Sequence, residues 1–176
     1  MILIENLQGE TMRQLLNGVQ DGLDLSLEAR KEIWAQCLHV EAELLQANVS
    51  PGDAVPRNIM VCASKDTPNS RSPRQQPRRL SCAACKRCPH RVVFFDFDRA
   101  VIHTDPESPA GKAFEKPPNP MNACYWWPQI ISGFEEWWAE WYTDEELRHR
   151  WLLEHFGGEH LVEYDYFTLH ADPDST

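Results

Sequence analysis

The sequence lacks any long run of apolar residues. No stretch approaches the roughly 18 apolar residues that a membrane-spanning helix needs, and only four residues precede Glu5. We therefore expect no membrane span and no signal peptide, and a reducing cytoplasm as the location. In that compartment the six cysteines are expected to be free thiols or metal ligands rather than disulfides.

Familiar catalytic motifs are missing as well. The chain has no glycine-rich phosphate-binding loop, no Gly-x-Ser-x-Gly elbow and no His-Glu-x-x-His motif. Its seven histidines are scattered along the chain, and it contains no internal repeats. These absences favour a protein without enzymatic activity. The length of 176 residues fits a single domain, 1–176.

Basic residues are outnumbered by acidic ones, 17 to 27, which gives a net charge of −10. The charge is unevenly distributed. Residues 65–91 hold eight basic residues and one acid, a charge of +7 that leaves −17 for the rest of the chain. Residues 134–176 hold twelve acids and two arginines. A basic middle and an acidic end are therefore predicted, and the acidic remainder argues against a general DNA-binding protein.

The spacing of apolar residues predicts the secondary structure. Helical spacing at 12–19 and from the cap Ser26 to about residue 47 predicts a helical hairpin within residues 1–48. Apolar runs at 57–64 and 91–103 are of strand length. The second run opens the acidic, tryptophan-rich part of the chain, 92–176.

In that last part, helical spacing at 128–142 predicts one helix. A capping box of Thr143 and Glu146 predicts a second helix. Alternation at 159–169 predicts a final strand. Since strands do not alternate regularly with single helices, the sequence indicates an α+β fold. Its parts are an N-terminal helical hairpin, a small antiparallel or mixed sheet, a C-terminal helix pair and a metal-stapled loop.

Residues 82–90, CAACKRCPH, contain the strongest chemical motif. Cys82, Cys85 and Cys88 are spaced so that one loop can deliver three thiolates to one metal ion. We expect a structural zinc ion, because the loop before the motif has three prolines and almost no apolar side chains with which to fold alone. The residues that would complete the four ligands are His90, Cys62, His103 or Cys124.

The same run resembles the loop that wraps a four-iron cluster in bacterial-type ferredoxins. The likeness covers about eight residues and includes a proline, here directly after Cys88. In that family a fourth cysteine follows the third by three residues. This chain lacks it, so Cys62 or Cys124 would have to replace it. A 4Fe–4S cluster is therefore the alternative cofactor.

The acidic end is expected to bind a protein partner with a basic surface. Trp137 is predicted to be partly exposed, and an exposed tryptophan can anchor an interface. The surrounding carboxylates would present a negative surface, and in one version of this hypothesis they imitate nucleic acid. The residues assigned to this surface are Trp137, Glu136, Glu140, Asp144 and Glu145. The chain is thus predicted to be a non-enzymatic, metal-stapled inhibitor, adaptor or assembly component.

Two alternative functions follow from other segments. Basic residues around a metal knuckle are common in nucleic-acid binders, and the residues concerned are Arg74, Arg78, Arg79, Lys86 and Arg87. In addition, VVFFDFDRAVIHTD resembles the opening motif of haloacid-dehalogenase-type phosphatases. That resemblance implies Asp96 as nucleophile and Asp98 as acid/base, although Arg99 and Ala100 replace the family's Gly-Thr.

Overall fold

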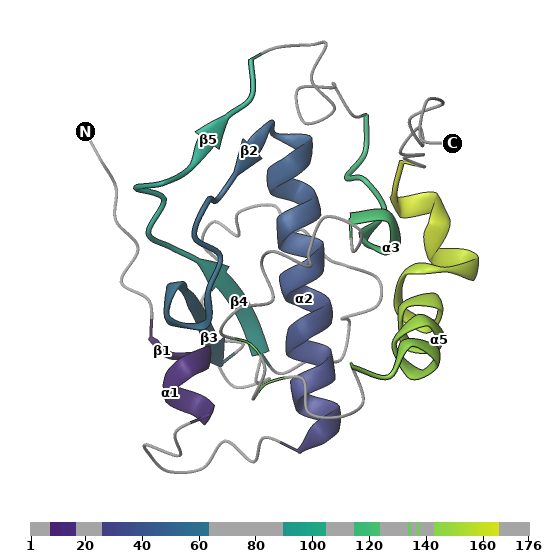
Figure 1. The fold of residues 1–176 in the computed structure, drawn as a ribbon, viewed down its shortest axis with the longest axis horizontal. Helices are drawn as coiled ribbons and strands as arrows, with labels where there is room; N and C mark the ends of the chain where they lie inside the picture. The colour runs from purple at the N-terminus through teal and green to yellow at the C-terminus, as the bar shows by residue number, and fades with distance from the viewer. Residues whose placement is uncertain are drawn as a thin grey trace, which may run out of the picture.

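The structure is a computed structural model of the chain. The described residues are 8–16, 26–63, 90–104, 115–123, 134, 137 and 143–165. Figure 1 shows α2 running through the middle of the molecule, with the strands on one side and α5 on the other.

The described elements follow one another in this order: β1 (Gly9–Thr11), α1 (Met12–Leu16), α2 (Leu27–Gln46), β2 (Val49–Ser50), η1 (Pro56–Asn58), β3 (Ile59–Ala63), β4 (His90–Phe94), β5 (Val101–Ile102), α3 (Pro120–Ala123), α5 (Glu145–Phe156) and η5 (Gly158–Glu163). The η elements are 3₁₀ helices.

Helix α2 forms where the sequence predicts it. The Ser26 hydroxyl caps it by accepting the Ala29 N–H at 3.2 Å, which satisfies one of the N–H groups that the first turn leaves open. Its predicted apolar face is buried at the positions Ile33, Trp34, Cys37 and Leu38. Its partner in the predicted hairpin, α1, is only five residues long.

The sheets are antiparallel throughout the described residues, which confirms the α+β class at a coarse level. One sheet has the order β1-β3-β4, and β2 pairs with β5 in a second. Helix α2 packs against β4 (Figure 1). Directly opposed residues of two strands point to the same face, and the buried pairs Ile59–Phe94 and Val61–Val92 form the core face.

The predicted strand 91–103 is broken into β4 and β5. Asp96 has a φ of 64°, in the left-handed region, and the Ala100 N–H donates to the Phe97 carbonyl at 3.1 Å, closing a turn. Opposite this turn, Gly52 has a φ of 71°, and a Cβ there would lie 2.1 Å from the Arg99 carbonyl oxygen. The ribbon β2–β5 thus continues β3–β4 after an irregular break.

The C-terminal part differs from the prediction in two places. Asp144, not Thr143, caps α5, since its carboxylate accepts the Leu147 N–H at 3.0 Å. The predicted strand 159–169 is wrong over residues 159–163. These residues belong to η5 (Gly158–Glu163), at whose end the Tyr164 N–H donates to the Leu161 carbonyl at 3.3 Å. The predicted helix 128–142 lies mostly outside the described residues.

The core joins both halves of the chain. Trp34 of α2 meets Phe134 edge to face at 5.0 Å between ring centroids, and Phe156 of α5 meets Tyr164 at 5.9 Å. All four side chains are buried in one cluster with the sheet residues. No helix among the described residues is long and apolar enough to cross a membrane.

Candidate metal centre and acidic surface

The predicted metal loop begins and ends at one point of the sheet. Ala63 and His90 are the last opposed residues of the antiparallel pair β3–β4, so residues 64–89 connect two neighbouring positions. The predicted ligands Cys82, Cys85, Cys88 and Cys124 lie outside the described residues. So do the predicted nucleic-acid contacts Arg74, Arg78, Arg79, Lys86 and Arg87.

Two further candidate ligands, Cys62 and His90, are described and point to opposite faces of the sheet. Cys62 is paired with Arg91, and His90 is paired with Ala63. Because side chains alternate along a strand, His90 shares the face of Val92, whereas Cys62 shares the face of Arg91. Two donors on one tetrahedral zinc lie within about 4 Å of each other. One zinc ion therefore cannot take both residues while this strand pairing persists.

The surroundings of these two side chains also differ. Cys62 is 7% exposed, and its Sγ would be 2.9 Å from a Cβ placed on Gly9 of β1, so a neighbouring strand crowds it. His90 is half-buried, and burial lowers the pKa of its imidazole, which favours the neutral form that binds metals. His90 also follows Cys88 by only two residues.

The remaining candidate ligand, His103, lies at the other end of the ribbon. It follows β5, its backbone N–H donates to the Asn48 carbonyl at 2.8 Å, and its Nε2 lies 2.8 Å from the Ser50 hydroxyl. The Ala63–His90 pair marks the opposite end. The described geometry thus separates His103 from the strand ends that hold the cysteine-rich segment.

The phosphatase-like pair is solvated. Asp96 and Asp98 are both exposed in the turn between β4 and β5. In the part of the chain that the structure describes, no group of three or more His, Cys, Asp or Glu residues is placed to hold a metal ion. The described residues therefore add no metal-binding partner to the two carboxylates.

The prediction of a partly exposed Trp137 is wrong. Its side chain is fully buried, and its indole N–H donates to the Arg30 carbonyl at 3.3 Å. The hydrogen bond ties the ring, which was expected to face solvent, to the first turn of α2. Trp137 is thus a core residue and no anchor for a partner. Glu136 and Glu140, predicted beside it, lie outside the described residues.

The two other predicted surface acids stand at the start of α5. Asp144 caps the helix, and Glu145 follows in its first turn; both are exposed. Negative charge at this position is favourable because the N-terminal end of a helix carries a partial positive charge. These carboxylates therefore stabilise α5 and also remain available on the surface.

Four exposed aliphatic side chains on α5 and η5 were not predicted from the sequence. Leu147 is 43% exposed, Leu153 46%, Leu161 46% and Val162 72%. Leu147 and Leu153 lie in α5, and Leu161 and Val162 lie in η5, where a strand was predicted. We call residues 143–165 the α5–η5 unit.

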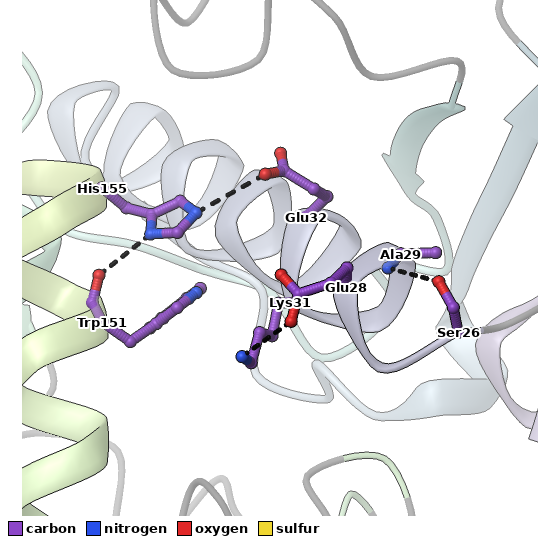
Figure 2. A network of polar contacts seen from close by, with 7 residues as sticks. All are labelled: Ser26, Glu28, Ala29, Lys31, Glu32, Trp151 and His155. Atoms are coloured by element: carbon purple, nitrogen blue, oxygen red, sulfur yellow. Dashed lines mark hydrogen bonds and ion pairs between the residues drawn. The ribbon is translucent and has the colours of Figure 1, made fainter.

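A histidine bridge links this unit to α2. Figure 2 shows the His155 ring between two partners: Nδ1 donates to the Trp151 carbonyl at 2.9 Å, and Nε2 lies 3.6 Å from the Glu32 carboxylate. Burial alone would lower the pKa of His155, but the bonds to Glu32 and Trp151 and the charges of Glu32 and Glu154 outweigh it and raise the pKa.

A second histidine bridge lies further along α2. His39 Nδ1 is 2.9 Å from the Tyr164 hydroxyl, and its Nε2 is 3.2 Å from the Glu43 carboxylate. The spacing of His39 and Glu43 by four residues was visible in the sequence. The contact with Tyr164, 125 residues away, was not.

Comparison with known proteins identifies no relative of this chain. No protein-family model matches the chain, and neither a curated protein nor a solved structure is found to be similar. The function is therefore argued from the residues themselves.

Proposed function

We propose that the chain is a non-enzymatic interaction protein whose β3–β4 hairpin carries a structural zinc site at its tip. The observation that carries this proposal is the pairing of Ala63 with His90. It holds the two ends of segment 64–89, which contains the three cysteines, next to each other. A metal bound there would order a segment that is too polar to fold by its own burial.

The proposed ligands are Cys82, Cys85, Cys88 and His90. His90 is preferred to Cys62 because the two point to opposite faces and His90 directly follows the cysteine run. Zinc accepts this mixture of three thiolates and one imidazole in a closed tetrahedral site. Such a site stabilises the loop and activates no water, since every position is filled by protein.

In this proposal the loop and the acidic end serve as contact surfaces of an inhibitor, adaptor or assembly component. The basic side chains of residues 65–91 would be displayed at the hairpin tip, and the carboxylates of the α5–η5 unit elsewhere on the molecule. The net charge of −10 favours protein over nucleic acid as the partner.

Elemental analysis, with an absorption spectrum, of protein purified without oxygen or added metal tests the proposal. We expect about one zinc per chain and no visible colour, in line with a closed structural site. Cys85→Ser and His90→Ala are each expected to lower both zinc content and melting temperature. Cys62→Ala is the matched control and should keep its zinc.

Other outcomes would change the proposal in specific ways. Iron with sulfide and a brown colour would replace zinc with a 4Fe–4S cluster. If His90→Ala retains zinc and a substitution of Cys124 loses it, Cys124 would replace His90 as the fourth ligand. A metal-free protein, with Cys85→Ser unchanged in melting temperature, would refute the metal staple. Binding of DNA or RNA that weakens steeply with salt would favour the nucleic-acid alternative.

A further inference from the structure

We propose that the outer side of the α5–η5 unit binds a basic, amphipathic helical segment of another protein. This inference rests on the proposed function as an interaction protein, and it names the surface and the chemistry of the partner. It replaces the buried Trp137 with a different set of contact residues.

The first argument is the exposure of apolar side chains. Eight large hydrophobic residues of the described chain are exposed, and four of them are Leu147, Leu153, Leu161 and Val162. Figure 1 shows α5 and η5 at the margin of the molecule, on the side of α2 away from the strands. Exposed apolar groups mark a binding surface where they form one contiguous patch, and half of those in the described chain fall within this unit.

The second argument is that the unit does not need these side chains to stay in place. Its inner side is held by Trp151, Leu152 and Phe156, which are 4%, 5% and 0% exposed and belong to the main core. The Asn119 side chain adds a bond to the Phe156 carbonyl at 3.0 Å. The exposed aliphatic residues are thus additional to the packing and lie on a pre-formed support, which lowers the entropic cost of binding.

The third argument is the sign of the charge. Residues 143–165 contain seven acids and two arginines, a net charge of −5. Arg150 is paired with Glu146 at 2.9 Å, so it already offsets one carboxylate. Glu154 and Glu159 are exposed between the aliphatic residues. A partner would therefore need lysine or arginine next to its apolar side chains.

The charges beside the other exposed apolar residues do not favour a partner of either sign. Phe97, Val101 and Ile102 are 43%, 52% and 70% exposed around β5. The charges beside them, Asp98 and Arg99, are of both signs. The sign of the charge thus selects a partner for the α5–η5 unit alone.

These features together describe a partner class. Amphipathic helices dock by laying an apolar face on exposed aliphatic groups, and their flanking basic residues would meet the carboxylates and speed association. DNA, RNA and anionic membranes would be repelled by this surface. A second copy of the chain, through its own basic segment 65–91, is the competing occupant.

The test uses the full chain as purified and a synthetic lysine–leucine peptide of about 14 residues, roughly four helical turns. Its binding is measured by calorimetry, with a scrambled peptide of equal composition as control. We expect the amphipathic peptide to bind, and Leu161→Ser with Val162→Ser to weaken it at least about tenfold, or 1.4 kcal/mol. Leu27→Ser removes another exposed leucine, from α2, 38% exposed, and should leave binding unchanged.

Charge is tested separately. Glu154→Gln with Glu159→Gln should weaken the peptide several-fold, and so should raising salt from about 50 to about 500 mM, because exposed ion pairs are screened. The melting temperature of every variant is also measured. If it is unchanged, a loss of binding is not caused by unfolding.

Three results would overturn the inference: no binding of the amphipathic peptide, equal binding of the scrambled one, or binding that ignores Leu161→Ser with Val162→Ser. Self-association that depends on these two residues would replace the foreign partner with a second copy. The two proposals are refuted by different results. If the chain contains zinc but does not bind the peptide, only the proposed surface is refuted. If it binds the peptide but contains no zinc, only the metal staple is refuted.

Discussion

The two faces of helix α2 are packed by different means. One face is apolar and meets the sheet and the aromatic core through Ile33, Trp34 and Cys37. The opposite face carries Glu32 and His39, which meet the C-terminal part of the chain through His155 and Tyr164. One helix thus joins the two halves of the fold: its apolar face belongs to the core that both halves share, and its opposite face adds polar bridges to the C-terminal half.

Each face carries a carboxyl group, and the comparison shows that burial decides its role. Glu41 lies on the apolar face, 5% exposed, and its Oε2 has no hydrogen-bond partner among the residues that the structure describes. Burial raises the pKa of Glu41 to about 8, so its neutral form prevails near pH 7. Glu32 is 40% exposed, stays in contact with water and receives His155. The same chemical group opposes folding in one place and links two helices in the other.

The largest effect is expected on the apolar face. Trp34→Ala should lower the free energy of unfolding by about 3–5 kcal/mol, because it empties a fully buried site and removes the contact with Phe134. Urea unfolding measures the loss. Leu27→Ala, at an exposed position of the same helix, is the control, and a comparable loss there would contradict the division into two faces.

The buried carboxyl group should oppose folding in a pH-dependent way. In the unfolded chain Glu41 ionises near 4.5, whereas in the folded chain its pKa is about 8. The free energy of unfolding should therefore fall as pH rises from about 4.5 to about 8. Glu41→Gln cannot ionise, so we expect it to be more stable than the wild type at pH 7 by an amount on the order of 3 kcal/mol.

Thermal unfolding of Glu41→Gln and wild type across this pH range provides the measurement. Glu28→Gln, in the exposed first turn of the same helix, should leave the pH dependence unchanged. Equal slopes for wild type and Glu41→Gln would show that this carboxyl group is solvated.

A smaller loss is expected where the C-terminal half is joined by a buried amide. Asn119 is 2% exposed; it donates to the Phe156 carbonyl at 3.0 Å and accepts the Met121 N–H at 2.8 Å. Asn119→Ala leaves both groups without this partner and should cost about 2 kcal/mol. Hydrogen exchange should report the loss first at the end of α5, and uniform protection of that end would contradict the assignment.

The smallest effect is expected at the histidine bridge. The folded pKa of His155 lies above its ordinary value, so its contribution is complete below about pH 6.5 and is lost as pH rises through the folded pKa. Since Glu32 is partly exposed, the contribution should stay below about 1 kcal/mol. His155→Gln should destabilise at pH 6 and have little effect at pH 9. His149→Gln, exposed on the same helix, serves as control.

The helices and strands that bury one face could be predicted from the sequence. The cap Ser26, the apolar face of α2 and the strand run 59–63 follow from local spacing alone. The break after β4 and the 3₁₀ helix η5 could not be read, because both depend on local backbone geometry. Asp96 adopts a left-handed conformation that few residues other than glycine take, and η5 replaces an alternating pattern that also suits a strand.

The candidate sites divide in the same way. A run of three cysteines predicts a metal from spacing alone, and it remains a prediction. The environment of Trp137 could not be predicted, because its exposure depends on a carbonyl 107 residues away in the chain. The opposite orientations of Cys62 and His90 depend on the register of two strands whose connection is 26 residues long, 64–89.

By itself the sequence determined the α+β class, the position of the long helix and the separation of basic and acidic segments. These properties depend on composition and on periods of two to four residues, which neighbouring positions express without distant partners. Tertiary structure alone decided which carboxyl group is buried, which tryptophan is covered and which leucines remain exposed. Burial is set by the residues that pack on a side chain, which local spacing does not reveal. Glu41 is 5% exposed, Trp137 is fully buried with its indole N–H on the distant Arg30 carbonyl, and Leu161 is 46% exposed.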